Sequence, residues 1–194
     1  MEITKKTKIF FIGAVWTQFG DKPKLMDDII MIKPNRITSE GILQLIINEE
    51  FEKLDEGTQV IMYIRIHGLP TDNDLTFDNK LFISYKEISE PIILHRKRGL
   101  TFYGILQSCY TGKNETLTKS FDMSVGSTNI VLGNPMRSET MVIDFFTKFK
   151  NYQLSDHFEN DFANKYCKMG NSITDCFGHI KDDEPEPWKL YKRS

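Results

Sequence analysis

Short runs of apolar residues recur along the chain, and polar segments separate them. A run in which both alternating faces are apolar is typical of a strand buried on both sides of a parallel sheet. The strongest strand signal among them is TQVIMYIRI, which breaks abruptly at His67 and Gly68. The pattern predicts strands over residues 8–15, 27–32, 58–66, 81–85, 100–106 and 129–132.

Helical spacing of apolar residues follows the second of these runs. It predicts a helix over 42–54, with hydroxyls of Thr38 or Ser39 available as N-caps and Gly57 ending the element. Glycine suits that end because it adopts the left-handed conformation at little cost.

Three further segments have helical character. Ser138 caps a predicted helix that extends to residue 149, and a second amphipathic helix spans 155–169. Residues 86–97 are expected to be helical only in part, because Pro91 has no N–H to donate. Strands that alternate with amphipathic helices predict an α/β fold, a three-layer α/β/α sandwich with a mainly parallel central sheet.

The chain length of 194 residues fits one domain with a sizeable core. No internal repeat or linker divides it. We expect one domain over residues 1–170 and a C-terminal extension over 171–194. This extension contains an acidic, proline-bearing stretch, so it is expected to pack loosely.

Charge and cysteine usage narrow the choice of partners and compartment. The 25 basic and 27 acidic residues give a net charge of −2, which provides no broad attraction to nucleic acid. No apolar stretch reaches the roughly 20 residues that span a bilayer. Three cysteines, Cys109, Cys167 and Cys176, do not suit a disulfide framework. The cytoplasm or another reducing compartment is therefore expected; secretion as an effector stays open without support from the sequence.

Two predicted strands end in residues that can do chemistry. His67 and Gly68 follow 58–66, and Gln107, Ser108 and Cys109 follow 100–106. The carboxyl ends of parallel strands meet at one edge of a sheet, where functional groups collect. A thiol is only a few per cent ionised at neutral pH, so it needs a base beside it, and histidine suits that role. The sequence therefore predicts a His67–Cys109 pair.

This pattern resembles the caspase-like cysteine peptidases, the group of caspases, metacaspases, legumain, gingipains and clostripain. In that family a histidine and then a cysteine each follow a hydrophobic strand. The segment Gln-Ser-Cys-Tyr-Thr-Gly, residues 107–112, is similar to the caspase Gln-Ala-Cys-Arg-Gly and metacaspase Asp-Ser-Cys-His-Ser-Gly blocks. The resemblance covers the order of elements from about residue 8 to 150.

The resemblance implies a cysteine endopeptidase that acts on a protein or peptide substrate. Cys109 would be the nucleophile and His67 the general acid and base, with the backbone N–H groups of Gly68 and Cys109 as the oxyanion hole. Gln107 would line the pocket for the residue before the scissile bond. Two alternatives stay open: an inactive caspase-like domain that binds proteins, and acyl transfer by the same pair.

The remaining candidate residues carry weaker signals. Cys176 and His179 are too few to form a zinc site, and His95 begins a basic cluster expected to be a solvated helix end. Asp72, Asn73 and Asp74, with Asp78 nearby, lack the glycine and closing glutamate of a calcium loop. Asn114 opens a glycosylation sequon that matters only in a secreted chain. No Gly-x-Gly-x-x-Gly or Walker A sequence is present, so neither a cofactor nor a metal is expected.

Overall fold

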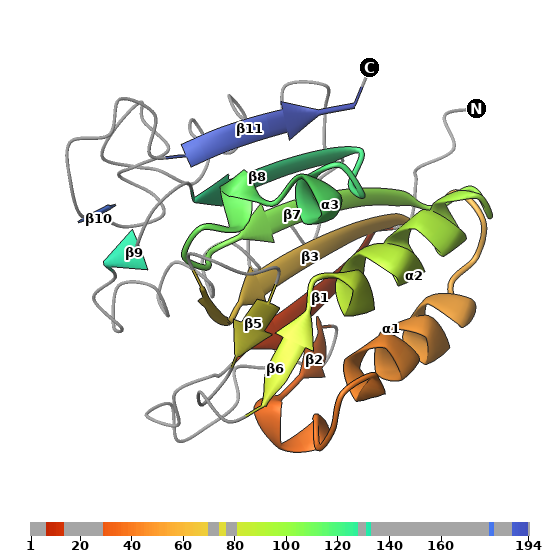
Figure 1. The fold of residues 1–194 in the computed structure, drawn as a ribbon. Helices are drawn as coiled ribbons and strands as arrows, with labels where there is room; N and C mark the ends of the chain where they lie inside the picture. Colours follow the sequence, from red (N-terminus) through yellow and green to blue (C-terminus); the bar gives the residue numbers. More distant parts are fainter. Residues whose placement is uncertain are drawn as a thin grey trace.

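The computed structural model describes residues 7–13, 29–69, 74–76, 81–127, 131–132, 179–180 and 188–193. A six-stranded central sheet organises these residues (Figure 1). Its strands in sequence order are β1 (Thr7–Gly13), β2 (Ile29–Ile32), β3 (Gln59–Arg65), β7 (Thr101–Leu106), β8 (Met123–Ser127) and β11 (Trp188–Lys192).

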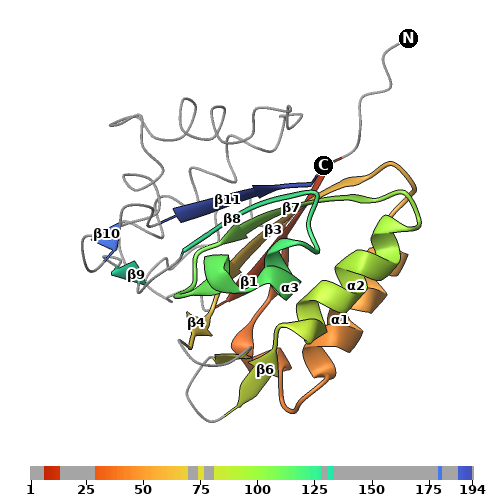
Figure 2. The same cartoon turned by 45° about the horizontal axis from the view of Figure 1, so that its top comes forward.

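The strands lie in the order β11-β8-β7-β3-β1-β2, and every pair is parallel except β8 with β11. The predicted α/β class with a mainly parallel sheet is confirmed. Helix α1 (Ile42–Glu52) joins β2 to β3, and α2 (Lys86–Arg96) lies between β3 and β7. Both connections move the same way across the sheet, so right-handed crossovers put both helices on one face (Figure 2).

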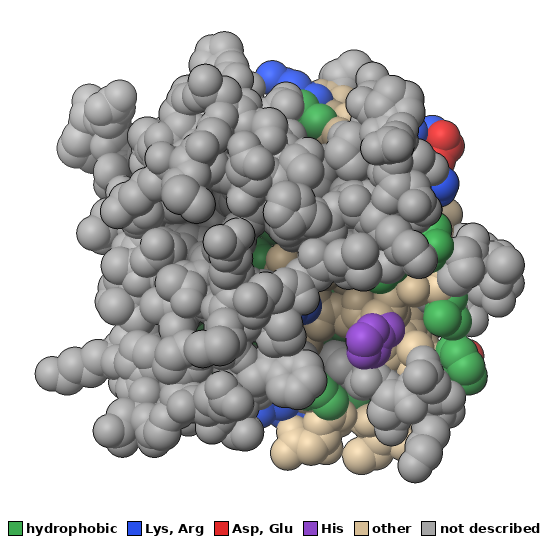
Figure 3. Space-filling model, turned by 90° about the vertical axis from the view of Figure 1, so that its left-hand side faces the viewer, with side chains coloured by type: hydrophobic (Ala, Val, Ile, Leu, Met, Phe, Trp, Pro, Cys, Tyr) green, Lys and Arg blue, Asp and Glu red, His purple; other side chains and the backbone are tan. Residues whose placement is uncertain are grey.

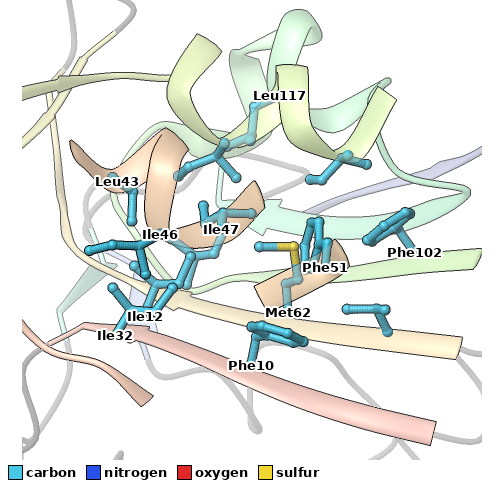
Figure 4. Close-up of a cluster of buried hydrophobic side chains, with 14 of the residues drawn as sticks. Phe10, Ile12, Ile32, Leu43, Ile46, Ile47, Phe51, Met62, Phe102 and Leu117 are labelled. Carbon is cyan, nitrogen blue, oxygen red and sulfur yellow. The ribbon is translucent and has the colours of Figure 1, made fainter. Parts of the chain in front are cut away.

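The main core fills the space between the sheet and these two helices (Figure 4). Phe51 of α1 is completely buried at its centre, with its ring centroid 5.0 Å from those of Phe10 and Phe102. Phe10 and Phe102 lie on β1 and β7, so one helical side chain ties two strands to α1.

The opposite face of the sheet is buried as well. Its side chains alternate with those of the main core, as a strand buried on both sides requires. This buried second face includes Ile9, Phe11, Ile61, Tyr63 and Ile105.

The segments with the other two predicted helices, 138–149 and 155–169, lie outside the described residues.

The ends of α1 differ from the prediction. No side chain caps its N-terminus, so the expected hydroxyl caps of Thr38 and Ser39 are wrong. Gly41 occupies the N-cap position at φ 82°, and its carbonyl accepts the Leu45 N–H at 3.2 Å. The helix ends before the expected Gly57, whose N–H donates to the Gly99 carbonyl where the chain approaches β3.

Helix α2 continues through Pro91, so the prediction of only partial helix was wrong. An internal proline costs about 3 kcal/mol because it removes a hydrogen bond and crowds the preceding turn. Burial of Ile88 and Ile92, both fully enclosed, offsets this cost at about 1.5–3 kcal/mol for each side chain.

The polar segment after β7 is more regular than its sequence suggested. It contains the short helices η3 (Thr111–Lys113) and α3 (Glu115–Thr118), followed by β8. Strand β8 was missed because its sequence, MSVGS, has two serines and a glycine beside only two apolar residues, although all five residues are buried. The predicted strand at 129–132 is confirmed in part as β9 (Val131–Leu132), which pairs with β10 (His179–Ile180) outside the central sheet.

The structure describes residues 188–192 of the predicted C-terminal extension. They form β11, an edge strand antiparallel to β8, with Trp188 opposite Ser127 and Lys192 opposite Met123. The loose packing of the rest of this extension stays a prediction. The boundary at residue 170 stays a prediction.

Replacing Phe51 with alanine should lower the free energy of unfolding by about 3–5 kcal/mol, because it leaves a cavity among three aromatic side chains. Urea unfolding of the whole chain measures this. The matched control is Leu45→Ala on the same helix: Leu45 is 59% exposed, so the change should stay within about 0.5 kcal/mol. Equal losses for the two variants would contradict the position of Phe51.

Candidate active site

Strands β3 and β7 finish at the same edge of the sheet. Ile64 pairs with Leu106, and the Gln107 N–H continues the ladder by donating to the Ile64 carbonyl at 2.9 Å. The chain of β3 passes directly into β4 (His67–Gly68). The prediction that the ends of these two strands are neighbours is therefore confirmed.

Beyond the ladder, Gly68 and Cys109 approach so closely that only glycine fits. A Cβ atom built on Gly68 would overlap the carbonyl oxygen of Cys109 and lie 3.2 Å from its amide nitrogen. This contact brings the backbone next to His67 against the backbone of Cys109.

A small antiparallel sheet holds His67 in place at this end of the molecule (Figures 1 and 2). It consists of β4, β5 (Asp74–Thr76) and β6 (Phe82–Ser84), and His67 pairs with Thr76. Strand β5 lies in the polar segment between the predicted strands 58–66 and 81–85, where no strand was predicted. His67 is exposed, and Cys109 is half-buried. Figure 3, a view from the side where β3 and β7 finish, shows an exposed histidine side chain next to uncharged atoms.

The turn after Cys109 has an unusual backbone. Tyr110 has φ 60°, the left-handed conformation that residues other than glycine adopt at a cost of about 1–2 kcal/mol. The ammonium of Lys113 lies 5.8 Å from the centre of the Tyr110 ring. Gly112 then passes so close to β8 that an added Cβ would overlap the Gly126 carbonyl oxygen. Contacts on both sides therefore hold the turn against its local strain.

Gln107 is buried at the end of β7. Its Oε1 accepts a hydrogen bond from the hydroxyl of Tyr63 on β3. Burial raises the pKa of Tyr63, against a smaller opposing effect of the Arg65 charge, so the hydroxyl keeps its proton and remains a donor. Sequence reasoning missed Tyr63. The available signal was a lone hydroxyl in a run of aliphatic residues, two positions from the end of β3.

The other histidine in the fully described part of the chain has a structural position. His95 is buried between α1 and α2, with Nε2 3.3 Å from Asn48 Oδ1 and Nδ1 2.8 Å from Arg98 Nη1. Arg96 donates to the Ser120 carbonyl at 2.6 Å. The predicted solvated helix end is therefore wrong for His95, which packs against the Phe51 ring.

Several weaker candidates lie outside the described residues, namely Cys167, Cys176, Asp72 and Asp78. The side chain of Asn114 serves as the N-cap of α3, where it accepts the Leu117 N–H at 2.8 Å. Within the described ranges, no three His, Cys, Asp or Glu side chains gather as metal ligands would. No helix in that part of the chain is long and apolar enough to cross a membrane.

Comparisons with known proteins give little sequence likeness. No family model and no curated protein matches the chain. A solved structure of a secreted C11 cysteine protease from Bacteroides thetaiotaomicron, called iotapain, is similar with a TM-score of 0.45 and 10% identity. The match covers 85% of this chain and 62% of that one. A serine palmitoyltransferase from S. paucimobilis with a bound PLP–myriocin aldimine has a TM-score of 0.31 and 12% identity, over 63% of this chain and 29% of that one. This chain thus spans less than two thirds of either protein.

Gly68→Ala should lower the free energy of unfolding by about 3 kcal/mol or more, because the new methyl group meets backbone that has little room to move. Gly41→Ala is the control: an added Cβ there meets nothing within 4 Å, so only the left-handed strain of about 1–2 kcal/mol applies. Urea unfolding compares the two. A smaller loss for Gly68→Ala than for Gly41→Ala would disprove the close approach to Cys109.

The stability of the protein should fall as pH drops below about 6.5. Burial, followed by the Arg98 charge, lowers the pKa of His95 from its ordinary 6.5, with Glu52 opposing. The folded state therefore binds a proton less readily than the unfolded chain. The stability that neutral His95 provides is complete above the unfolded pKa and is lost as pH falls through the lowered folded-state pKa. Urea unfolding across this range should give a flatter pH slope for His95→Gln than for the wild type; equal slopes would contradict the assignment.

Proposed function

We propose that this chain is a cysteine endopeptidase, with Cys109 as nucleophile and His67 as general acid and base. The observation that supports this most directly is the contact of the Gly68 and Cys109 backbones beyond β3 and β7. The histidine on β4 and the half-buried thiol in the turn after β7 therefore lie on adjoining backbone. Their order along the chain and the segment 107–112 match the caspase-like pattern.

In the proposed reaction, His67 takes the thiol proton and the Cys109 thiolate attacks the substrate carbonyl carbon. The backbone N–H groups of Gly68 and Cys109 donate to the oxyanion that forms. When the carbon–nitrogen bond breaks, the His67 imidazolium gives its proton to the leaving amine. Water then attacks the thioester, with His67 as base, and releases the carboxylic acid product and the thiol.

The resemblance also assigns Gln107 to the pocket for the residue before the scissile bond. That assignment stays a prediction. The side chain is buried, and its Oε1 already accepts the Tyr63 hydroxyl, which gives Gln107 one role inside the protein. A reducing compartment would keep the thiol competent, and it stays a prediction too.

Wild-type protein should react covalently at Cys109 with peptide acyloxymethyl ketones. Because cleavage specificity is open, the probe set should carry acidic, basic and apolar residues at the position before the reactive group. Cys109→Ala should abolish labelling, and His67→Ala should slow it by about 10²–10⁴-fold, the usual contribution of a positioned acid–base group. Mass spectrometry locates the label, and fluorogenic peptides with the same residues measure hydrolysis.

Cys176→Ala is the matched control for loss of a thiol, and it should label and hydrolyse like the wild type. Wild-type protein that labels with none of the probes and hydrolyses none of the peptides would overturn the proposal. That result would favour an inactive domain that binds proteins.

A further inference from the structure

The hydroxyl of Ser108 replaces a backbone group in the ladder between β3 and β7. After the Gln107 N–H bond to Ile64, a parallel ladder would continue with the Ile66 N–H donating to the carbonyl of residue 107. Ile66 N–H instead donates to Ser108 Oγ at 3.0 Å. Ser108 Oγ also lies 3.4 Å from the Ile64 carbonyl, to which it donates. One buried side chain therefore extends the pairing past the ends of both strands.

The positions of these bonds matter because of their neighbours. Ile66 directly precedes His67, and Ser108 directly precedes Cys109. The Ser108 hydroxyl thus connects, by a hydrogen bond, the two residues that directly precede the proposed pair. It does not touch either reacting side chain in any hydrogen bond that the structure gives.

Thr111 closes the same turn from the other side. Its Oγ1 lies 3.0 Å from the Leu106 carbonyl oxygen and 2.8 Å from the Ser108 carbonyl oxygen, which share its one proton, and the residue is completely buried. These bonds span Tyr110, the residue with left-handed backbone. A strained conformation persists only where its surroundings hold it, and Thr111 supplies part of that support.

We propose that Ser108 and Thr111 are positioning residues that set the placement of Cys109 relative to His67, an inference that rests on the proposed function. Loss of either hydroxyl should let the Cys109 turn shift while the rest of the sheet stays intact. A shift of about 1 Å in a reacting group can lower the rate about a hundredfold. Substrate binding, which does not depend on the thiol–imidazole distance, should change little.

The test compares Ser108→Ala and Thr111→Val with controls that lose similar hydroxyls elsewhere. Ser120 and Thr118 are also buried, and their hydroxyls donate to the carbonyls of Leu117 at 2.6 Å and Asn114 at 2.9 Å. Both control residues lie in the α3 segment that leads to the start of β8, the end of the sheet opposite to Cys109. The controls are Ser120→Ala and Thr118→Val.

The first readout needs no substrate: the rate at which iodoacetamide alkylates Cys109 in the whole chain, followed by mass spectrometry across a series of pH values. His67→Ala defines the profile of a thiol without its base. Ser108→Ala and Thr111→Val should shift the profile toward that of His67→Ala, and the controls should follow the wild type. With a peptide substrate, kcat should fall about ten- to a hundredfold with little change in KM. Thr111→Ser, which keeps a hydroxyl, should show most of the wild-type alkylation profile and most of the wild-type kcat.

The outcomes separate the two proposals. If His67→Ala leaves the alkylation profile unchanged, His67 does not act on Cys109, and the proposed function and this inference both fall. If His67→Ala changes the profile while Thr111→Val and Ser108→Ala do not, the positioning role alone is overturned. Circular dichroism checks folding. If Ser108→Ala does not fold, Thr111→Val, which keeps the shape of threonine, and its comparison with Thr111→Ser decide the result.

Discussion

The parallel pairing of β3 with β7 determines where every feature of the candidate site lies. Their register puts Ile64 beside Leu106, and the bond from the Gln107 N–H to the Ile64 carbonyl fixes the two chains as they leave the sheet. From there the chains cannot separate, because Gly68 and Cys109 contact each other through their backbones. A shift of one residue in this register would exchange the two faces of a strand and turn main-core side chains such as Met62 away from Phe51. The core around Phe51 and the candidate site therefore depend on the same alignment.

Much of the fold could be predicted from the sequence because its strongest signals are local. An unbroken apolar run such as the one that forms β3 has few alternatives to a strand buried on both faces. The ends of such runs also showed which polar residues would share one edge, so the neighbourhood of His67 and Cys109 was accessible before the structure.

The remaining features depend on contacts between distant residues. The helix through Pro91 is maintained by burial of Ile88 and Ile92, which the local cost of proline does not reveal. The sequence MSVGS looked like a loop because serine and glycine interrupt its two apolar residues, yet strands on both sides enclose it. The role of Ser108 is of the same kind: its hydroxyl bonds to residues more than forty positions away. Nothing within a short window of sequence distinguishes this serine from one in a solvent-exposed turn.

The strand β11 has a consequence for the order in which the chain assembles. Residues 188–192 complete the sheet beside β8, although about sixty residues separate the two strands. During synthesis from the N-terminus, the other five strands of the sheet emerge well before β11. The outer edge of β8 then presents unpaired backbone groups, which are a template for strands of other molecules. Arrival of β11 covers that edge, so a strand made about sixty residues after β8 protects the growing sheet from intermolecular pairing.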